Sequence, residues 1–248
     1  AEADRVAGGW SSAEAVARGV LASEPQENLL ERVEASFLLA RLASGRGRLE
    51  EAARVLRDLD APRFRSLLGS PEALLPLAVA RTECEVEGGR ADAAWTALAP
   101  ALDEGARNRP TFLNAVLWSN ALYLGVALAV GRNDLGSAAR WSAELHRVAA
   151  ELDEPWTRGW ALRAEGLLAQ GRGELQDAVG AFERSLAQWE TLDWPFETGL
   201  TLCLLGEALG AAARPDPASE FLDRAAAVFA RLGADRYANR VTLDLRRR

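Results

Sequence analysis

Five alanines recur along this chain at intervals of 42, 44, 40 and 40 residues, and no other feature limits its fold as strongly. They are Ala52, Ala94, Ala138, Ala178 and Ala218. Four positions after each comes a mostly bulky set: Leu56, Leu98, Ser142, Phe182 and Leu222. Repeats of about 20–50 residues are typical of stacked arrays in which each unit buries its apolar face against the next. We therefore expect stacked helix pairs, in which the second helix packs closely on the first through its alanine.

Glycine and proline mark the turns between these helices. A Gly–Arg pair precedes four of the alanines, and the pairs lie 42, 42 and 40 residues apart: Gly47–Arg48, Gly89–Arg90, Gly131–Arg132 and Gly171–Arg172. Glycine after a periodic segment supplies the left-handed conformation that closes a helix. Pro155 and Pro195 fit the first turn of the next helix, where no backbone N–H is needed.

The segments between these marks are rich in Ala and Leu, with apolar residues at helical spacing, and isoleucine is absent. No segment alternates as a strand does. Pro62 and Pro71 bracket a short segment between two of the expected helices. The pattern predicts an all-α chain with helices near 11–23, 26–45, 48–60, 70–88, 90–104, 111–130, 133–152, 156–170, 173–192, 196–210, 216–231 and 235–246.

Composition argues against several kinds of chemistry. The chain has no lysine, so all 29 cationic side chains are arginines, and neither a lysine-containing phosphate loop nor a Schiff base can form. Cys84 and Cys203 lie far apart, and His146 is the one histidine. A zinc site, a disulfide scaffold and a Ser–His–Asp triad are therefore all disfavoured. We expect no catalytic residues, no metal and no cofactor.

Charge and hydropathy argue against nucleic-acid binding, membrane insertion and secretion. The net charge of −7 argues against direct nucleic-acid binding by this segment. The longest apolar stretch, near 121–130, is too short to cross a bilayer, and no signal peptide opens the chain. We expect a cytoplasmic protein that does not insert into membranes.

The repeat resembles the tetratricopeptide repeat, in which a glycine precedes the alanine by twelve positions. Gly166, Ala178 and Phe182 match this pattern, as do Gly206, Ala218 and Leu222, whereas Ala40, Thr82 and Val126 replace the glycine in earlier units. The period of 40–44 residues exceeds the usual 34, which implies longer helices. The resemblance implies a right-handed superhelix of about five to six antiparallel pairs. We expect one solenoid over 1–248, with a partial repeat at 1–25, five hairpins at 26–232 and a capping helix at 233–248.

Longer repeats of this kind are similar to those in large bacterial transcriptional regulators of the maltose-regulator and LuxR type. The resemblance covers about 26–245, and the ending at 229–240 is similar to the last repeat before their DNA-binding module. It implies a non-catalytic domain that binds an effector or a protein and acts as a sensor or interaction scaffold. The alternative is a free-standing repeat adaptor that assembles other proteins.

The first helix of each pair lines the concave side of such a solenoid. Positions six and three before the glycine position, and one after it, give these predicted groove residues: Arg41, Glu83, Asn120, Tyr123, Trp160, Arg163 and Glu207. Asn120 aligns with Trp160 and Tyr123 with Arg163 one repeat of 40 residues later, so each pair would lie side by side. Together they could hold a protein, a peptide or a small-molecule effector through arginine pairing and aromatic contact.

A second interpretation of these residues remains open, in which they pair with one another and pack across helix interfaces. Trp118 and Trp160 are the tryptophans best placed for recognition. Trp95, Trp141 and Trp189 are expected in the core, and His146 is expected to be solvated. The sequence leaves the oligomeric state open.

Overall fold

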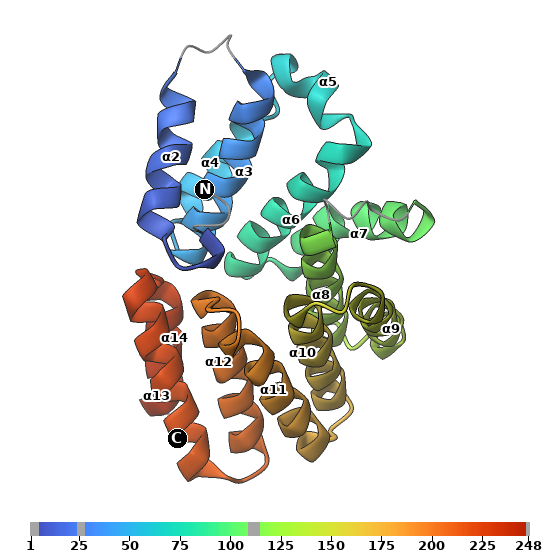
Figure 1. Cartoon of the computed structure of the whole chain (residues 1–248), viewed down its shortest axis with the longest axis vertical. Helices are drawn as coiled ribbons and strands as arrows, with labels where there is room; N and C mark the ends of the chain where they lie inside the picture. The colour runs from blue at the N-terminus through green and yellow to red at the C-terminus, as the bar shows by residue number, and fades with distance from the viewer. Residues whose placement is uncertain (1–4, 24–27, 109–114, 247–248) are drawn as a thin grey trace. The chain divides into compact units, whose positions relative to one another are not determined.

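The computed structural model describes residues 5–23, 28–108 and 115–246. Over these ranges it contains thirteen α-helices and one short 3₁₀-helix, with no strand (Figure 1). The all-α prediction is confirmed. The helices form two compact units, Ala1–Arg109 and Pro110–Arg248. One continuous solenoid over 1–248, with the predicted repeat boundaries, stays a prediction.

The first unit holds six α-helices, and within it α2 packs on α3, α3 on α4, and α6 on both α3 and α7. Their bounds, with the short 3₁₀-helix, are α2 (Trp10–Ala22), α3 (Leu29–Gly45), α4 (Leu49–Asp58), η1 (Pro62–Phe64), α5 (Arg65–Leu68), α6 (Pro71–Glu87) and α7 (Ala91–Arg107). The predicted helix starts at 26 and 111, and the start of the partial repeat at residues 1–4, lie outside the described residues.

The second unit holds seven helices in which each element packs on the next, and α10 also packs on α8. Figure 1 shows α10 to α14 running side by side. The bounds are α8 (Ala115–Gly131), α9 (Leu135–Leu152), α10 (Pro155–Gly171), α11 (Leu175–Glu190), α12 (Pro195–Ala211), α13 (Pro215–Leu232) and α14 (Asp235–Arg246). Pro155 and Pro195 begin α10 and α12, as predicted.

The repeated alanines form the contacts within the pairs, and all five are wholly buried. The glycine position explains how closely these helices approach. A Cβ built on Gly166 would lie 2.5 Å from the ring of Phe182, and one on Gly206 would lie 2.7 Å from Leu222. Glycine, alanine and the bulky residue thus form one packing unit, because any larger side chain at the first two positions would separate the helices.

The turns follow one rule in every repeat, which differs in part from the prediction. The residue two positions before each second helix has a positive φ: Gly47, Gly89, Asn133, Gly173 and Ala213. The next residue donates its N–H to the carbonyl five residues back, as Arg48 does to Ala43 at 2.8 Å. This is the Schellman closure of a helix. Gly131 and Gly171 of the Gly–Arg pairs are instead the last residues of α8 and α10.

Helix α4 is shorter than its counterparts. It spans 10 residues, whereas α7, α9, α11 and α13 span 17, 18, 16 and 18. Pro62 explains the early end, because its ring disfavours helical backbone at the preceding residue, and Ala61 is extended with ψ 141°. The predicted helix at 48–60 therefore ends two residues too late. None of the helices in the described ranges combines the length and apolar character needed to cross a membrane.

Candidate functional site

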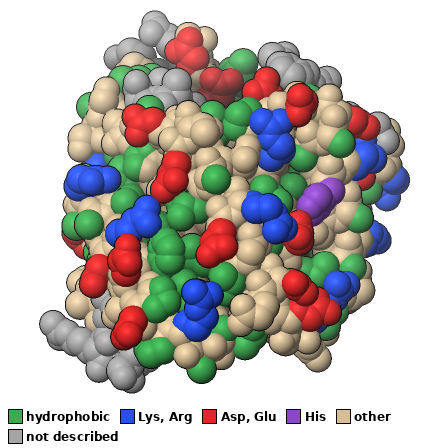
Figure 2. All heavy atoms as spheres, turned by 60° about the horizontal axis from the view of Figure 1, so that its bottom comes forward, with side chains coloured by type: hydrophobic (Ala, Val, Ile, Leu, Met, Phe, Trp, Pro, Cys, Tyr) green, Lys and Arg blue, Asp and Glu red, His purple; other side chains and the backbone are tan. Residues whose placement is uncertain are grey.

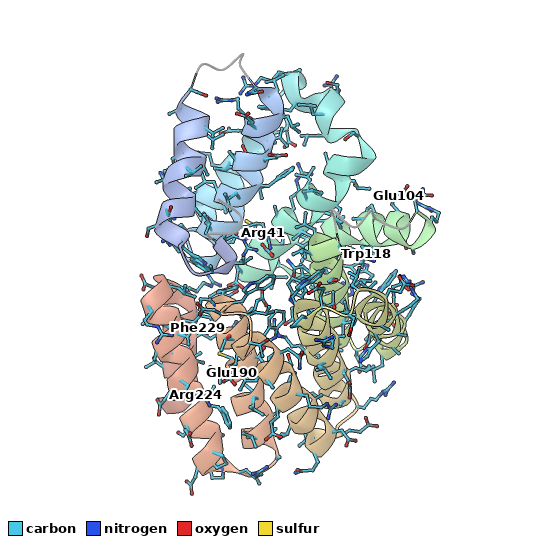
Figure 3. The ribbon with its side chains drawn as sticks, in the orientation of Figure 1. Arg41, Glu104, Trp118, Glu190, Arg224 and Phe229 are labelled. Carbon is cyan, nitrogen blue, oxygen red and sulfur yellow. The ribbon has the colours of Figure 1, made fainter. Side chains whose placement is uncertain are left out.

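Arg41 of α3 and Glu83 of α6 form a two-pronged ion pair. The Nε and Nη2 groups of Arg41 donate to the two carboxylate oxygens of Glu83 at 2.8 and 2.9 Å. Both residues occupy the position one after the glycine position of their repeats, so neighbouring first helices bring equal register positions together. The Arg41 side chain is 8% exposed (Figure 3). The pair joins α3 to α6, and a role for it in ligand binding stays a prediction.

Tyr123 of α8 lies beside Arg163 of α10, and these two helices pack together. The guanidinium carbon of Arg163 lies 5.0 Å from the centroid of the Tyr123 ring, so the predicted juxtaposition of these two residues is present, while that of Asn120 with Trp160 stays a prediction. Its environment differs from the expected one. Arg163 is wholly buried, and Trp160 and Asn120 are 3% and 6% exposed. Tyr123 is half-buried, and burial raises the pKa of its phenol although the Arg163 charge opposes the rise.

Arg163 is engaged by the chain itself. Its Nη1 pairs with a carboxylate oxygen of Glu197 at 2.7 Å, its Nη2 donates to the Glu197 carbonyl, and its Nε donates to the Thr201 hydroxyl. The guanidinium also lies 4.9 Å from the centroid of Trp189. Since neither the arginine fork nor the Trp160 ring is open to a ligand, these side chains pack across the interfaces of α8, α10, α11 and α12. The structure corrects the expectation of an accessible clamp at Trp160 and Arg163.

Four tryptophans surround this interface. Trp160 contacts Trp156, Trp189 and Trp194 edge-on, with ring centroids 5.4–6.1 Å apart, and Trp189 stacks on Trp194 at 5.8 Å. The expectation that Trp189 lies in the core is met, because it is wholly buried and its Nε1 donates to Ser185. Trp141 is also buried and Trp95 is half-buried. Trp118 is 3% exposed, so it offers no recognition surface (Figure 3).

His146 and Glu207 complete the residues singled out from the sequence. His146 is exposed, as expected (Figure 2). Its Nε2 lies 3.3 Å from Glu165 Oε2, while Arg184 donates to the other Glu165 oxygen at 2.8 Å. These three side chains bridge α9, α10 and α11. Glu207 lies half-buried on α12.

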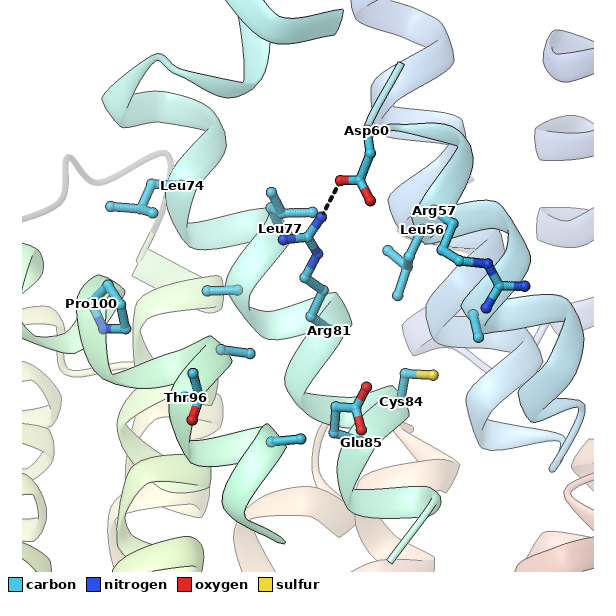
Figure 4. Close-up of a pocket in the computed structure, with 14 residues that line it drawn as sticks. Leu56, Arg57, Asp60, Leu74, Leu77, Arg81, Cys84, Glu85, Thr96 and Pro100 are labelled. Atoms are coloured by element: carbon cyan, nitrogen blue, oxygen red, sulfur yellow. Dashed lines mark hydrogen bonds and ion pairs between the residues drawn. The ribbon is translucent and has the colours of Figure 1, made fainter. Parts of the chain in front are cut away.

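The first unit contains an open groove that the sequence analysis did not identify (Figure 4). It has a volume of about 670 Å³ and lies over α6, with α4 on one side and α7 on the other. Across it, Arg81 Nη2 donates to Asp60 at 2.8 Å. Apolar side chains form most of the lining, which comprises Ala53, Leu56, Arg57, Asp60, Leu74, Leu77, Ala78, Arg81, Cys84, Glu85, Ala93, Thr96, Ala97 and Pro100.

Two sequence features account for this groove. Helix α4 ends at Asp58, and α7 presents short side chains at Ala93, Ala97 and Pro100 along the facing wall. The Pro62 that ends α4 and the Pro100 within α7 were the signals available in the sequence. They indicate missing helical turns and missing side-chain bulk, but only the packed structure shows that both occur on one surface.

The groove offers binding surface rather than reactive groups. Burial raises the pKa of the Cys84 thiol, so this cysteine stays protonated and unreactive near neutral pH. Within the parts of the chain that the structure describes, no three His, Cys, Asp or Glu side chains come together as metal ligands would. The chemistry of the groove is that of apolar contact bounded by a few charges.

Solved structures of similar fold exist for this chain, although its sequence matches no family model. A search of curated proteins finds no relative. The crystal structure of BtubC (BKLC) from P. vanneervenii matches with 19% identity and a TM-score of 0.52, over 92% of this chain and 91% of that one. The apo form of RapI matches with 12% identity and a TM-score of 0.55, over 92% of this chain and 63% of its own.

A third solved structure is a Signal Transduction ATPase with Numerous Domains protein with a tetratricopeptide repeat sensor, from Pyrococcus horikoshii. It matches with 14% identity and a TM-score of 0.53, over 86% of this chain. This chain spans about a third of that protein and less than two thirds of RapI. At these identities the likeness shows the fold alone, which is a tetratricopeptide-like helical repeat.

Proposed function

We propose that this chain is a non-catalytic repeat domain that binds an effector or a partner protein, and that it serves as the sensor or interaction scaffold of a bacterial transcriptional regulator. The observation that carries the proposal is the open apolar groove over α6, which a helical-repeat scaffold presents without reactive groups. The tetratricopeptide repeat sensor named in the Pyrococcus structure is a precedent for a sensing domain of this fold beside an ATPase.

The surroundings of the one histidine and the two cysteines support a binding role. His146 has one ring nitrogen 3.0 Å from the Ser142 carbonyl of its own helix and the other 3.3 Å from Glu165, which joins α9 to α10. Cys84 and Cys203 are buried thiols. The imidazole is thus paired with a carboxylate, and the two thiols are enclosed in the packed interior.

The gene itself tests the regulator assignment. We expect the reading frame to continue upstream into an ATPase and downstream into a helix-turn-helix domain. In the full-length protein, Leu77→Arg in the groove should abolish the response to the inducing signal while leaving DNA binding intact, because a charge there would block the apolar floor. A frame that contains neither flanking domain would favour the free-standing adaptor. If the Leu77→Arg protein still responds to the inducing signal, the groove is not the binding site.

A further inference from the structure

The charged residues beside the groove over α6 have counterparts in the second unit that are joined by ion pairs. Measured from the repeated alanines, Asp60, Arg81 and Pro100 occupy the same register positions as His146, Glu165 and Arg184. In the second unit, His146 from α9 and Arg184 from α11 contact the two oxygens of Glu165 on α10. The first helix of this pair, α10, is therefore bridged to the second helices on both of its sides.

In the first unit the charges are exchanged: the central residue is the cation Arg81 instead of a glutamate. Only one of the two ion pairs is present, the one with Asp60. Arg81 of α6 pairs with Asp60 after α4, but Pro100 of α7 carries no charge with which to reach it from the other side. The Arg81 and Asp60 side chains are 38% and 65% exposed. An exposed pair of this kind contributes little stability, on the order of 0–1 kcal/mol. Arg81 is therefore available to an acidic group that approaches from the α7 side.

The apolar lining has the spacing that another helix would match. Along α6 the groove is floored by Leu74, Leu77, Ala78, Arg81 and Cys84, which recur at helical intervals of three and four residues. This stripe spans about 15 Å at 1.5 Å per residue, or nearly three helical turns. On α7, Ala93 and Ala97 are short enough to let a neighbouring backbone approach closely.

We propose that this groove binds an amphipathic helix of a partner protein, about three turns long, whose apolar face lies on α6 and whose acidic side chain pairs with Arg81. The proposal rests on the proposed function and names its partner class. A helix fits because the groove is open along its length, whereas a small ligand is normally enclosed over most of its surface. Helix-in-groove recognition uses anchors at i, i+3, i+4 and i+7, which is the spacing that the floor offers.

The test uses two designed peptides of about fourteen residues, long enough to cover the groove. Both carry leucines at alternating three- and four-residue intervals and differ only at one central position on the flank of that face, glutamate in one and arginine in the other. Fluorescence anisotropy measures their binding to the whole chain. We expect the glutamate peptide to bind about fivefold more tightly, as expected from replacing charge repulsion by an ion pair at an exposed site.

Variants of the chain then locate the site. Arg81→Glu should reverse the preference between the peptides, and Leu77→Arg should abolish binding of both. Thr96→Trp should also block binding by filling the groove, and because Thr96 is exposed this variant keeps the fold. The matched control is Glu165→Gln, at the register position of Arg81 in the second unit, which should leave both affinities unchanged. Circular dichroism confirms that each variant remains helical.

Equal affinity of the two peptides, or binding that survives Leu77→Arg and Thr96→Trp, would overturn the proposal. Binding of a medium-chain fatty acid that these variants block, with no binding of either peptide, would also overturn it and assign the groove to a small molecule. Failure of both peptides while Leu77→Arg still silences the full-length protein would reject the helix and retain the proposed function. No effect of Leu77→Arg in either assay would reject both.

Discussion

The carboxylate of Glu197 and the guanidinium of Arg163 form an ion pair of 2.7 Å in which the arginine is wholly shielded from solvent. Truncating one partner of a buried pair leaves the other charge without compensation, which costs about 3–5 kcal/mol. We therefore expect Arg163→Ala to lower the free energy of unfolding by about that amount, measured by urea denaturation. The loss concerns stability, because this side chain reaches no open surface.

A surface pair provides the matched control. Arg224 and Glu190 are also 34 residues apart and join α13 to α11 at 3.1 Å, but their side chains are 44% and 50% exposed (Figure 3). Arg224→Ala should change the unfolding free energy by less than about 1 kcal/mol. Equal losses in the two variants would show that Arg163 is not desolvated as the structure places it.

Gly159 is a position where one added methyl group should be costly. A Cβ at this position would lie 2.6 Å from the Trp189 ring, which is fixed by its hydrogen bond to Ser185. We expect Gly159→Ala to destabilise the chain by about 1–3 kcal/mol, as overpacking of a tight contact does. Thermal denaturation followed by circular dichroism measures the effect.

Gly180 on α11 is the control for this substitution. Its nearest neighbour to an added Cβ is the flexible end of Arg184 at 3.6 Å, so no packed atom has to move. Gly180→Ala should raise stability by up to about 1 kcal/mol, because alanine favours helix over glycine. A gain in both variants would contradict the close approach of α10 and α11.

The sequence predicted the parts of the fold that local patterns control. The five repeated alanines identified the contacts within the helix pairs, and Pro155 identified the start of α10. The left-handed residue at Asn133 was missed because glycine is the stronger signal and Gly131 stands two positions earlier. Turn position is set by the backbone hydrogen-bond pattern, which several residue types can satisfy.

The candidate site was harder to predict because exposure depends on the whole packing arrangement. Register correctly placed Arg163 beside Tyr123, but it could not show that Glu197 and Thr201 on the next first helix engage the guanidinium. Arginine is rarely buried without such partners, and the sequence alone left both an exposed and a packed arrangement open. The groove over α6 was missed because it forms where large side chains are absent, at positions such as Pro100. A missing side chain leaves no pattern that the sequence would show as a site.

The repeated alanines lead to a third prediction. Ala178 is wholly buried at the contact of α11 with α10, whereas Ala187 on the same helix is exposed. Ala178→Leu adds three carbons where no space exists and should lower the unfolding free energy by about 1–3 kcal/mol or more. Ala187→Leu adds the same atoms in solvent and should stay within about 0.5 kcal/mol of the parent. An unchanged melting temperature for Ala178→Leu would contradict the placement of Ala178 at a tight helix contact.

Glu14 gives the first unit a dependence on pH. Burial tends to raise the pKa of this carboxyl, but hydrogen bonds from Arg48 and Arg18, with the nearby Arg46 charge, outweigh it and hold the pKa below the usual 4.5. Arg18 and Arg48 each contact Glu14 at 2.7 Å, so one carboxylate joins α2 to the turn between α3 and α4. A carboxyl whose pKa is lower in the folded state stabilises that state above its unfolded pKa, and this stability is lost as the pH falls through the folded value.

We therefore expect the unfolding free energy of the parent chain to fall as the pH drops below about 4.5, with Glu14 contributing part of the slope. Glu14→Gln should be less stable than the parent at pH 7, because Arg46 and Arg48 lose their charged partner. It should also lose stability less steeply on acidification, since glutamine takes up no proton. Urea denaturation of both proteins across this range measures the difference. Parallel curves for the two proteins would show that Glu14 binds its proton equally well in the folded and unfolded states.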